Sequence, residues 1–200
     1  TYPVADVRFL CPNDGGVLDV LLDWDALKIT VDPADIKSST EPSIWRYLPL
    51  LPVSKPAAQD TPLNHVGWTP VYETPRLAAS IGLDRLWIKD ESSNPSASFK
   101  DRASALLVQR AADIGAKTII TASTGNAVAA LAAMAAAVGA SAVILAPKTA
   151  PPAKIAQLLI YGAEVILIDG NYDQAVELAQ AAAEDFGWYC RNTGYNPFTA

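Results

Sequence analysis

The sequence has only two cysteines, one histidine and one methionine in 200 residues. Cys11 and Cys190 lie far apart, so neither a disulfide framework nor a paired metal-binding knuckle is expected. Basic residues are also in the minority, since 15 Lys and Arg stand against 21 Asp and Glu. The net charge of -6 argues against nucleic acid as the main partner, because such binding needs a basic face. A small anionic ligand is still compatible with this charge, because a local positive site can lie within an acidic protein.

Features of export and of membrane insertion are also missing. The first residues, Thr1 to Asp6, lack the basic flank and apolar core of a signal peptide, which makes a cytoplasmic location the expectation. The uncharged stretch 121–147 is long enough by count to cross a bilayer. It is dominated by alanine, however, and Gly139 interrupts it before the strand-like run 141–145. We therefore expect a core-packing helix followed by a strand, and no contact with a membrane.

Four glycines at near-regular spacing predict an α/β fold. Each follows a helix-like pattern and precedes a short run rich in β-branched or aromatic residues; they are Gly115, Gly139, Gly162 and Gly187. A glycine after a helix supplies the left-handed residue that ends it. Helices alternating with short strands at this spacing predict a parallel sheet flanked by helices. Motifs for dinucleotide binding and for a phosphate loop are absent from the sequence.

Residues 1–60 differ from this pattern, because they are rich in proline and only weakly periodic. They predict a small irregular N-terminal region, with a ribbon-like hairpin around Asn13 to Gly16, a short helix near Trp45 and a linker. The α/β core is predicted to occupy residues 61–200. Its first strand is expected at Leu86 to Lys89.

One candidate site surrounds Lys100. It follows this strand and precedes a helix that we expect to end near Ile114. Ser98 and Asp101 form a Ser-x-x-Asp pattern, which is typical of the capped start of a helix. Lys100 would then lie in the first turn, where the helix dipole disfavours a positive charge and so favours a nucleophilic amine. An ordinary capped helix with a solvated lysine explains the same pattern.

A second candidate site is the turn Thr121 to Asn126, between a predicted strand and the alanine-rich helix. Hydroxyls, a glycine backbone and an amide at a helix N-terminus can bind a carboxylate or a phosphate. In open α/β sheets, ligands bind at the carboxyl ends of the strands. The alternative is that Ser, Thr and Asn only cap the helix.

Together these segments resemble those of one enzyme family. Asn-Pro-Ser-Ala-Ser-Phe-Lys-Asp-Arg at 94–102 resembles the Asn-Pro-Thr-Gly-Ser-Phe-Lys-Asp-Arg segment of threonine synthases. Ala-Ser-Thr-Gly-Asn-Ala at 122–127 resembles their Ala-Ser-Ser-Gly-Asn-Ala loop. The likeness covers most of the chain from Trp45 onward. It implies the pyridoxal-phosphate (PLP) fold of type II, which is that of the tryptophan synthase β subunit.

The resemblance also implies residue roles. Lys100 would be the catalytic residue, holding pyridoxal 5'-phosphate as a Schiff base and moving protons at the substrate. Phe99 and Asn126 would bind the cofactor with it, Asn126 through the ring oxygen. The implied substrate-binding residues are Ser123, Thr124 and Gly125 at the carboxylate, with Asn192 and Thr193 near the phosphate. The family reaction converts O-phospho-L-homoserine and water to L-threonine and phosphate.

The sequence departs from the family pattern at three places. Ser96-Ala97 replaces Thr-Gly, and because alanine disfavours a positive φ we expect a differently set loop. The glycine-rich loop for the cofactor phosphate belongs to the second half of such enzymes. The chain therefore looks truncated, and these 200 residues alone are expected to bind the cofactor weakly or not at all. Cys11 to Gly16 resembles half of a zinc-ribbon knuckle, but Asp14 replaces its second cysteine, so no metal is expected.

Two other functions are compatible with the sequence. The first is another PLP-dependent β-replacement or elimination enzyme, of the cysteate synthase or threonine dehydratase type. Trp45-Arg46-Tyr47 and the lysine segment favour threonine synthases over dehydratases, but separate them poorly from cysteate synthases. The second is a non-catalytic truncated homologue. A small amino-acid substrate is the expected partner, and a homodimer is expected only by analogy with relatives.

Overall fold

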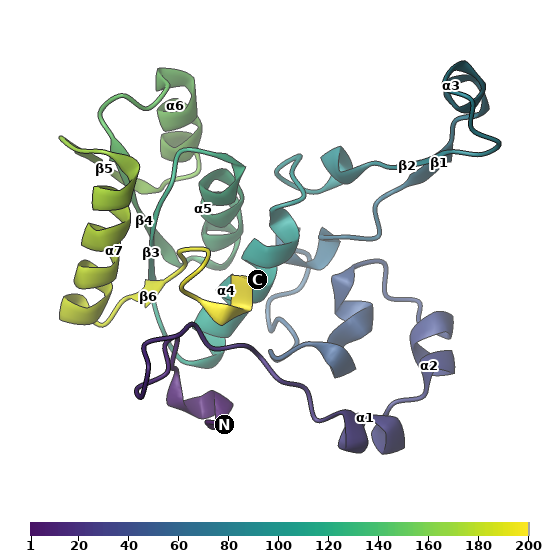
Figure 1. Ribbon diagram of the computed structural model, residues 1–200, viewed down its shortest axis with the longest axis horizontal. Coiled ribbons are helices and arrows are strands. Elements are labelled where there is room, and N and C mark those ends of the chain that lie inside the picture. The colour runs from purple at the N-terminus through teal and green to yellow at the C-terminus, as the bar shows by residue number, and fades with distance from the viewer. Residues whose placement is uncertain (200) are drawn as a thin grey trace.

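The computed structural model describes residues 1–199, and its parallel β-sheet lies on one side of the molecule, on the left in Figure 1. The sheet has four strands in the order β5-β4-β3-β6, and each neighbouring pair is parallel. The strands are β3 (Thr118–Ala122), β4 (Ser141–Pro147), β5 (Glu164–Ile168) and β6 (Tyr189–Cys190). The predicted parallel sheet is thus confirmed.

Helices cover both faces of this sheet, as Figure 1 shows. They are α4 (Asp101–Asp113), α5 (Asn126–Val138), α6 (Pro152–Ile160) and α7 (Tyr172–Phe186). Ile119 and Ile144 pack on the side of α4, α5 and α6, whereas Ile120 and Val143 pack on the side of α7. Neighbouring strand residues point to opposite faces, so one strand supplies side chains to two cores.

The four glycines end their helices as predicted, each with a positive φ between 66° and 77°. The alanine-rich helix α5 packs Leu131 and Met134 into the core, with both side chains fully buried. Its small alanines allow α4 to pack closely against it. Within residues 1–199, none of the helices combines the length and apolarity needed to cross a membrane.

The N-terminal region consists of short elements joined by irregular chain. These are η1 (Val4–Asp6), α1 (Trp24–Thr30), α2 (Pro33–Ser38), η2 (Ile44–Leu50) and η3 (Pro62–His65). The chain reverses at the predicted hairpin, where Leu10 and Val17 form a single antiparallel bridge. Helices α1 and α2 were not predicted, although Asp23 and Asp32 cap their first turns. The domain boundary near residue 60 stays a prediction.

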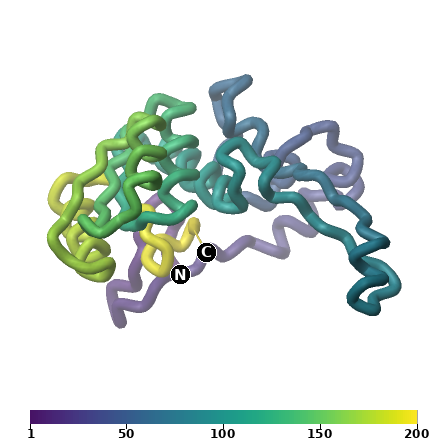
Figure 2. The backbone as a smooth tube through the Cα atoms, turned by 90° about the horizontal axis from the view of Figure 1, so that it is seen from above, coloured from purple at the N-terminus to yellow at the C-terminus, as the bar shows by residue number. Residues whose placement is uncertain are grey.

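A two-stranded arm projects from this body (Figure 2). It contains β1 (Val71–Glu73), α3 (Pro75–Ser80) and β2 (Trp87–Lys89), and its strands pair antiparallel with each other. The prediction that the strand at Leu86 to Lys89 belongs to the parallel sheet is therefore wrong. All residues of β1 and β2 are exposed, so their hydrophobic pattern does not reflect burial in this sheet.

Candidate active site

Both candidate segments lie at the carboxyl end of the parallel sheet. Only the turn 114–117 separates α4 from β3, so this helix and this strand run in opposite directions. The start of α4, with Lys100, therefore lies at the same end of the sheet as the turn Ser123 to Gly125 that follows β3. This is the end at which open α/β sheets bind ligands.

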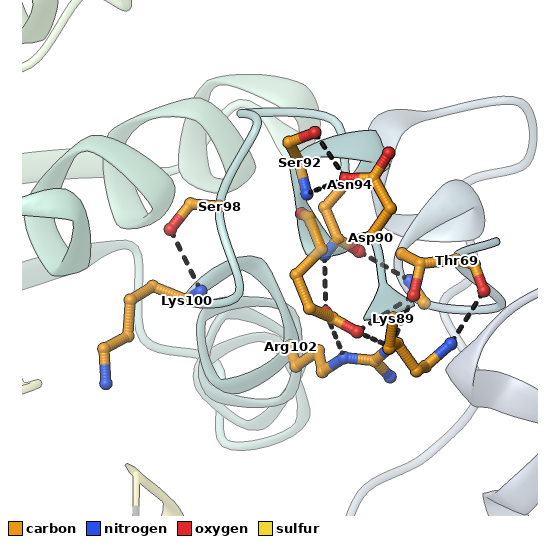
Figure 3. Close-up of polar contacts among 10 residues, drawn as sticks. Thr69, Lys89, Asp90, Ser92, Asn94, Ser98, Lys100 and Arg102 are labelled. Carbon is orange, nitrogen blue, oxygen red and sulfur yellow. Dashed lines mark hydrogen bonds and ion pairs between the residues drawn. The ribbon is translucent and has the colours of Figure 1, made fainter. Parts of the chain in front are cut away.

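Lys100 immediately precedes α4 and exposes its amine. Its backbone N–H donates to Ser98 Oγ at 3.1 Å. Its Nζ has no hydrogen-bond or ion-pair partner within residues 1–199 and lies 5.9 Å from the centre of the exposed Phe99 ring. In Figure 3 the side chain extends away from Thr69, Asn94 and Arg102. The amine is thus available to a ligand.

The predicted Ser98–Asp101 cap takes another form. The helix begins at Asp101, later than expected, and its carboxylate accepts from the N–H and Oγ of Ser96 instead of returning to Ser98. Asp101 is fully buried, and burial raises the pKa of its carboxyl. These hydrogen bonds hold the loop that precedes Lys100 against the first residue of α4.

The loop before Lys100 has Ser96-Ala97 where the family pattern has Thr-Gly, but Ala97 still adopts the backbone conformation that favours glycine. Ala97 has a φ of 57°, in the left-handed region. The prediction that alanine would avoid a positive φ here is wrong, because the contacts on both sides of Ala97 hold the loop. Its N–H donates to the carbonyl of Asn94 at 2.8 Å, and the neighbouring Ser96 is bound by Asp101.

Ala97→Gly is expected to stabilise the protein by about 0.5 kcal/mol. Glycine relieves about 1 kcal/mol of left-handed strain in the folded state. It also raises the conformational entropy of the unfolded chain, which offsets about half of this gain. Urea unfolding of the full-length protein measures the difference. Ala97→Val should instead destabilise it, and an equal midpoint for both variants would contradict a left-handed residue 97.

The turn after β3 presents small polar groups to solvent. Ser123 Oγ accepts from the N–H of Gly125 at 3.2 Å, and Gly125 and Asn126 are exposed. Asn126 Oδ1 also accepts from Lys154 Nζ in the first turn of α6, at 3.2 Å. Lys154 was not predicted from the sequence, because no local motif marks it and only the packing of α6 brings it to this edge.

Asn192 and Thr193 follow β6 at the same edge and have different environments. Asn192 is buried, and its Oδ1 accepts from Thr121 Oγ1 at 3.0 Å and from the N–H of Ala122 at 2.9 Å. Contact between this side chain and a substrate phosphate stays a prediction; it would use the amide Nδ2, which donates to the carbonyl of Val176 at 3.5 Å. Thr193 is exposed and accepts from Arg191 through its Oγ1.

A polar cluster not predicted from the sequence lies beside the lysine loop (Figure 3). Glu91, in η4 (Glu91–Ser93), accepts two hydrogen bonds of 2.8 Å from Arg102 and one bond of 2.9 Å from each of Thr69 and Asn94. These bonds, led by those from Arg102, lower the pKa of Glu91 to about 2. Glu91 is therefore ionised at neutral pH.

The depressed pKa of Glu91 predicts a loss of stability in acid. The carboxylate stabilises the folded state above its usual pKa of 4.5, and this contribution disappears as the pH falls towards 2. We expect it to amount to about 1–2 kcal/mol, because water partly screens the pair. Urea midpoints at neutral pH and in this acidic window, for the parent and Glu91→Gln, measure it. An equal acid shift in both proteins would contradict the prediction.

Comparison with known proteins agrees with this geometry. The family model described as "Pyridoxal-phosphate dependent enzyme" matches residues 62–200. A threonine synthase of Methanosarcina acetivorans is 38% identical over 98% of this chain, and one of Methanocaldococcus jannaschii is 36% identical over 99%. The chain covers 47% and 48% of these two relatives, so it spans about half the length of the curated relatives it matches.

Solved structures show the same fold. O-ureido-L-serine synthase superimposes with a TM-score of 0.60 at 28% identity, covering 66% of this chain and 43% of its own. Cysteine synthase from Entamoeba histolytica has a TM-score of 0.60 at 25% identity, covering 70% of this chain and 45% of its own. The parallel sheet with its flanking helices is thus part of the PLP fold of type II. The chain belongs to the family of pyridoxal-phosphate dependent enzymes.

Proposed function

We propose that the full-length protein is a threonine synthase, which converts O-phospho-L-homoserine and water to L-threonine and phosphate. The placement of Lys100 and the turn Ser123 to Asn126 at one end of the sheet carries this proposal. Relatives with this name match nearly the whole chain at 36–38% identity, which supports it.

The residues at this edge suit pyridoxal phosphate. The cofactor requires a lysine amine for its aldehyde, and Lys100 offers one that is exposed and has no hydrogen-bond or ion-pair partner within residues 1–199. Asn126 offers an exposed amide for the ring. We propose that Lys100, Asn126 and Phe99 hold the cofactor, which supplies an electron sink for carbanions at the substrate.

Residues of this chain are also assigned to substrate binding and proton transfer. We propose that Ser123, Thr124 and Gly125 bind the substrate carboxylate through hydroxyls and backbone N–H groups at the start of α5. The Lys100 amine removes and returns protons at the substrate carbons. We propose that Asn192 and Thr193, which follow β6, approach the substrate phosphate, while Asn192 Oδ1 also holds the end of β3.

A second candidate is a β-replacement enzyme on a serine-derived substrate. O-ureido-L-serine synthase and cysteine synthase resemble this fold at 28% and 25% identity, which favours this alternative over unrelated chemistry. Their identity to this chain is lower than that of the threonine synthases. We therefore rank it second.

We also propose the biological setting by analogy with biosynthetic relatives. The full-length enzyme is placed in the cytoplasm as a homodimer, with neither a nucleic-acid nor a membrane partner. Within it, residues 1–60 form an N-terminal region and 61–200 the first part of the catalytic core. The start of the family match at residue 62 supports this boundary.

The test uses the full-length protein with pyridoxal phosphate and O-phospho-L-homoserine. Phosphate release and threonine formation are followed together, with O-phosphoserine, serine and threonine as competing substrates. Equal amounts of phosphate and threonine are expected. Cofactor colour with turnover of only the serine-derived substrates would favour the second candidate, and colour without any turnover would favour a non-catalytic homologue.

A further inference from the structure

Glu91 and Arg102 form a pair with two parallel hydrogen bonds beside the lysine loop. Glu91 Oε2 accepts from Arg102 Nε and Oε1 accepts from Nη2, both at 2.8 Å. This planar fork fixes the direction of both side chains as well as their distance. Only 22% of the Glu91 side chain and 25% of that of Arg102 are exposed, so the pair is largely shielded from water.

Two further side chains tie this pair to another segment of the chain. Thr69 Oγ1 donates to Glu91 Oε1, and Asn94 Nδ2 donates to Oε2, both at 2.9 Å. Asn94 is buried, and its Oδ1 accepts from the N–H of Gly67 at 2.9 Å. In Figure 3, Thr69, Asn94 and Arg102 lie together beside the loop that leads to Lys100. The segment 67–69, the end of the arm and the start of α4 therefore meet at one carboxylate.

The Glu91–Arg102 pair joins the segment before the Lys100 loop to the helix that follows it. Glu91 precedes the loop, and Arg102 follows Lys100 by two residues in the first turn of α4. The Lys100 side chain has no hydrogen-bond or ion-pair partner within residues 1–199, and its amine lies 5.9 Å from the ring of the adjacent Phe99, so its place is determined by the backbone that carries both residues. That backbone is held by Asp101 on Ser96 inside the loop and by Arg102 on Glu91 across it.

We propose that Glu91 and Arg102 are positioning residues, which hold Lys100 where its amine can bond to the cofactor. The inference rests on the proposed role of Lys100. In that step the neutral amine donates its electron pair to the aldehyde carbon of pyridoxal phosphate. A C=N bond replaces C=O, and the oxygen leaves as water with the two amine protons. A displacement of about 1 Å lowers such a rate by up to about 100-fold.

The experiment measures this bond directly and needs no turnover. Full-length apoprotein is mixed with pyridoxal phosphate, samples are reduced with borohydride at intervals, and peptide mapping measures the labelled Lys100. Glu91→Gln and Arg102→Gln are expected to slow labelling about 10-fold or more. Arg102→Lys, which keeps the charge but forms no fork, should fall between these variants and the parent.

A matched control comes from a second Glu–Arg pair in the arm. Glu73 accepts from Arg85 Nε at 3.0 Å, but these side chains are 48% and 62% exposed and lie away from the lysine loop. Glu73→Gln should leave the labelling rate at the parent value. A purely electrostatic influence of the Glu91 pair would change the rate in opposite directions in Glu91→Gln and Arg102→Gln, whereas a positioning role slows both.

The outcomes distinguish failure of the positioning role of Glu91 and Arg102 from failure of the proposed role of Lys100. Labelling of Lys100 at the parent rate in both Glu91→Gln and Arg102→Gln overturns the positioning role and leaves the proposed function intact. Opposite changes in the two variants overturn it as well. Labelling of another lysine in the parent overturns the role of Lys100 and this inference with it. If urea midpoints show that a glutamine variant is partly unfolded, Arg102→Lys decides, and a parent rate in that variant overturns the proposal.

Discussion

Lys100→Ala in the full-length protein is expected to lower turnover by about 1,000-fold or more. The variant loses both the group that holds the cofactor and the base that moves substrate protons. The visible absorption of lysine-bound cofactor should disappear with it. The free energy of unfolding should change by less than about 0.5 kcal/mol, because the exposed side chain forms no hydrogen bond with residues 1–199.

Lys117→Ala is the matched control for this experiment. Lys117 is also exposed, but it lies at the amino end of β3, at the opposite edge of the sheet. Turnover and cofactor absorption should match those of the parent. A Lys100→Ala variant that keeps more than about a tenth of parental turnover would show that another residue is the base, since loss of such a group costs far more.

Gly67→Ala is expected to destabilise the protein by about 3 kcal/mol. A Cβ atom at this position would lie 2.4 Å from Ile44 Cγ2, 3.0 Å from Arg102 Nη1 and 3.2 Å from the backbone N of Ile44. The glycine also has a φ of 85°, which an alanine adopts only with strain. Relief requires the buried Ile44 to move, and the close approach to Arg102 Nη1 also displaces the guanidinium, so the substitution should loosen the lysine loop as well.

Gly139→Ala separates strain from crowding. Gly139 has a φ of 71°, but within residues 1–199 a Cβ atom added to it would meet no other atom within 4 Å. This variant should therefore lose only about 0.5 kcal/mol, because the less flexible unfolded chain of the alanine variant offsets about half of the left-handed strain. Urea midpoints of the two variants measure the difference. Equal midpoints would mean that the contacts around Gly67 relax without cost.

The regular part of the fold was predictable because its signals are local. Positive φ values at Gly139 and Gly187 follow from a glycine placed directly after a helical pattern. The segment Leu86 to Lys89 was correctly predicted as extended chain but assigned to the wrong sheet. Hydrophobic residues reveal extended chain, whereas the partner of a strand depends on distant sequence, here on Val71 to Glu73.

The site was only partly predictable for the same reason. Lys100 and Asn126 lie within contiguous motifs, so their chemistry could be inferred from neighbouring letters. Glu91 and Arg102 are eleven positions apart and belong to different elements, and only packing shows that they pair. Lys154 reaches Asn126 through the position of α6, and no spacing in the sequence indicates this.

By itself the sequence determined the alternation of helices and strands, the lysine segment and the polar turn. Each of these depends on periodicity, capping and turn chemistry within a few residues. The tertiary structure alone decided which strands pair, that Ala97 adopts a positive φ, that Asn192 is buried, and that Glu91 closes the lysine loop. These outcomes depend on contacts between distant segments, whose combined free energy outweighs local preference.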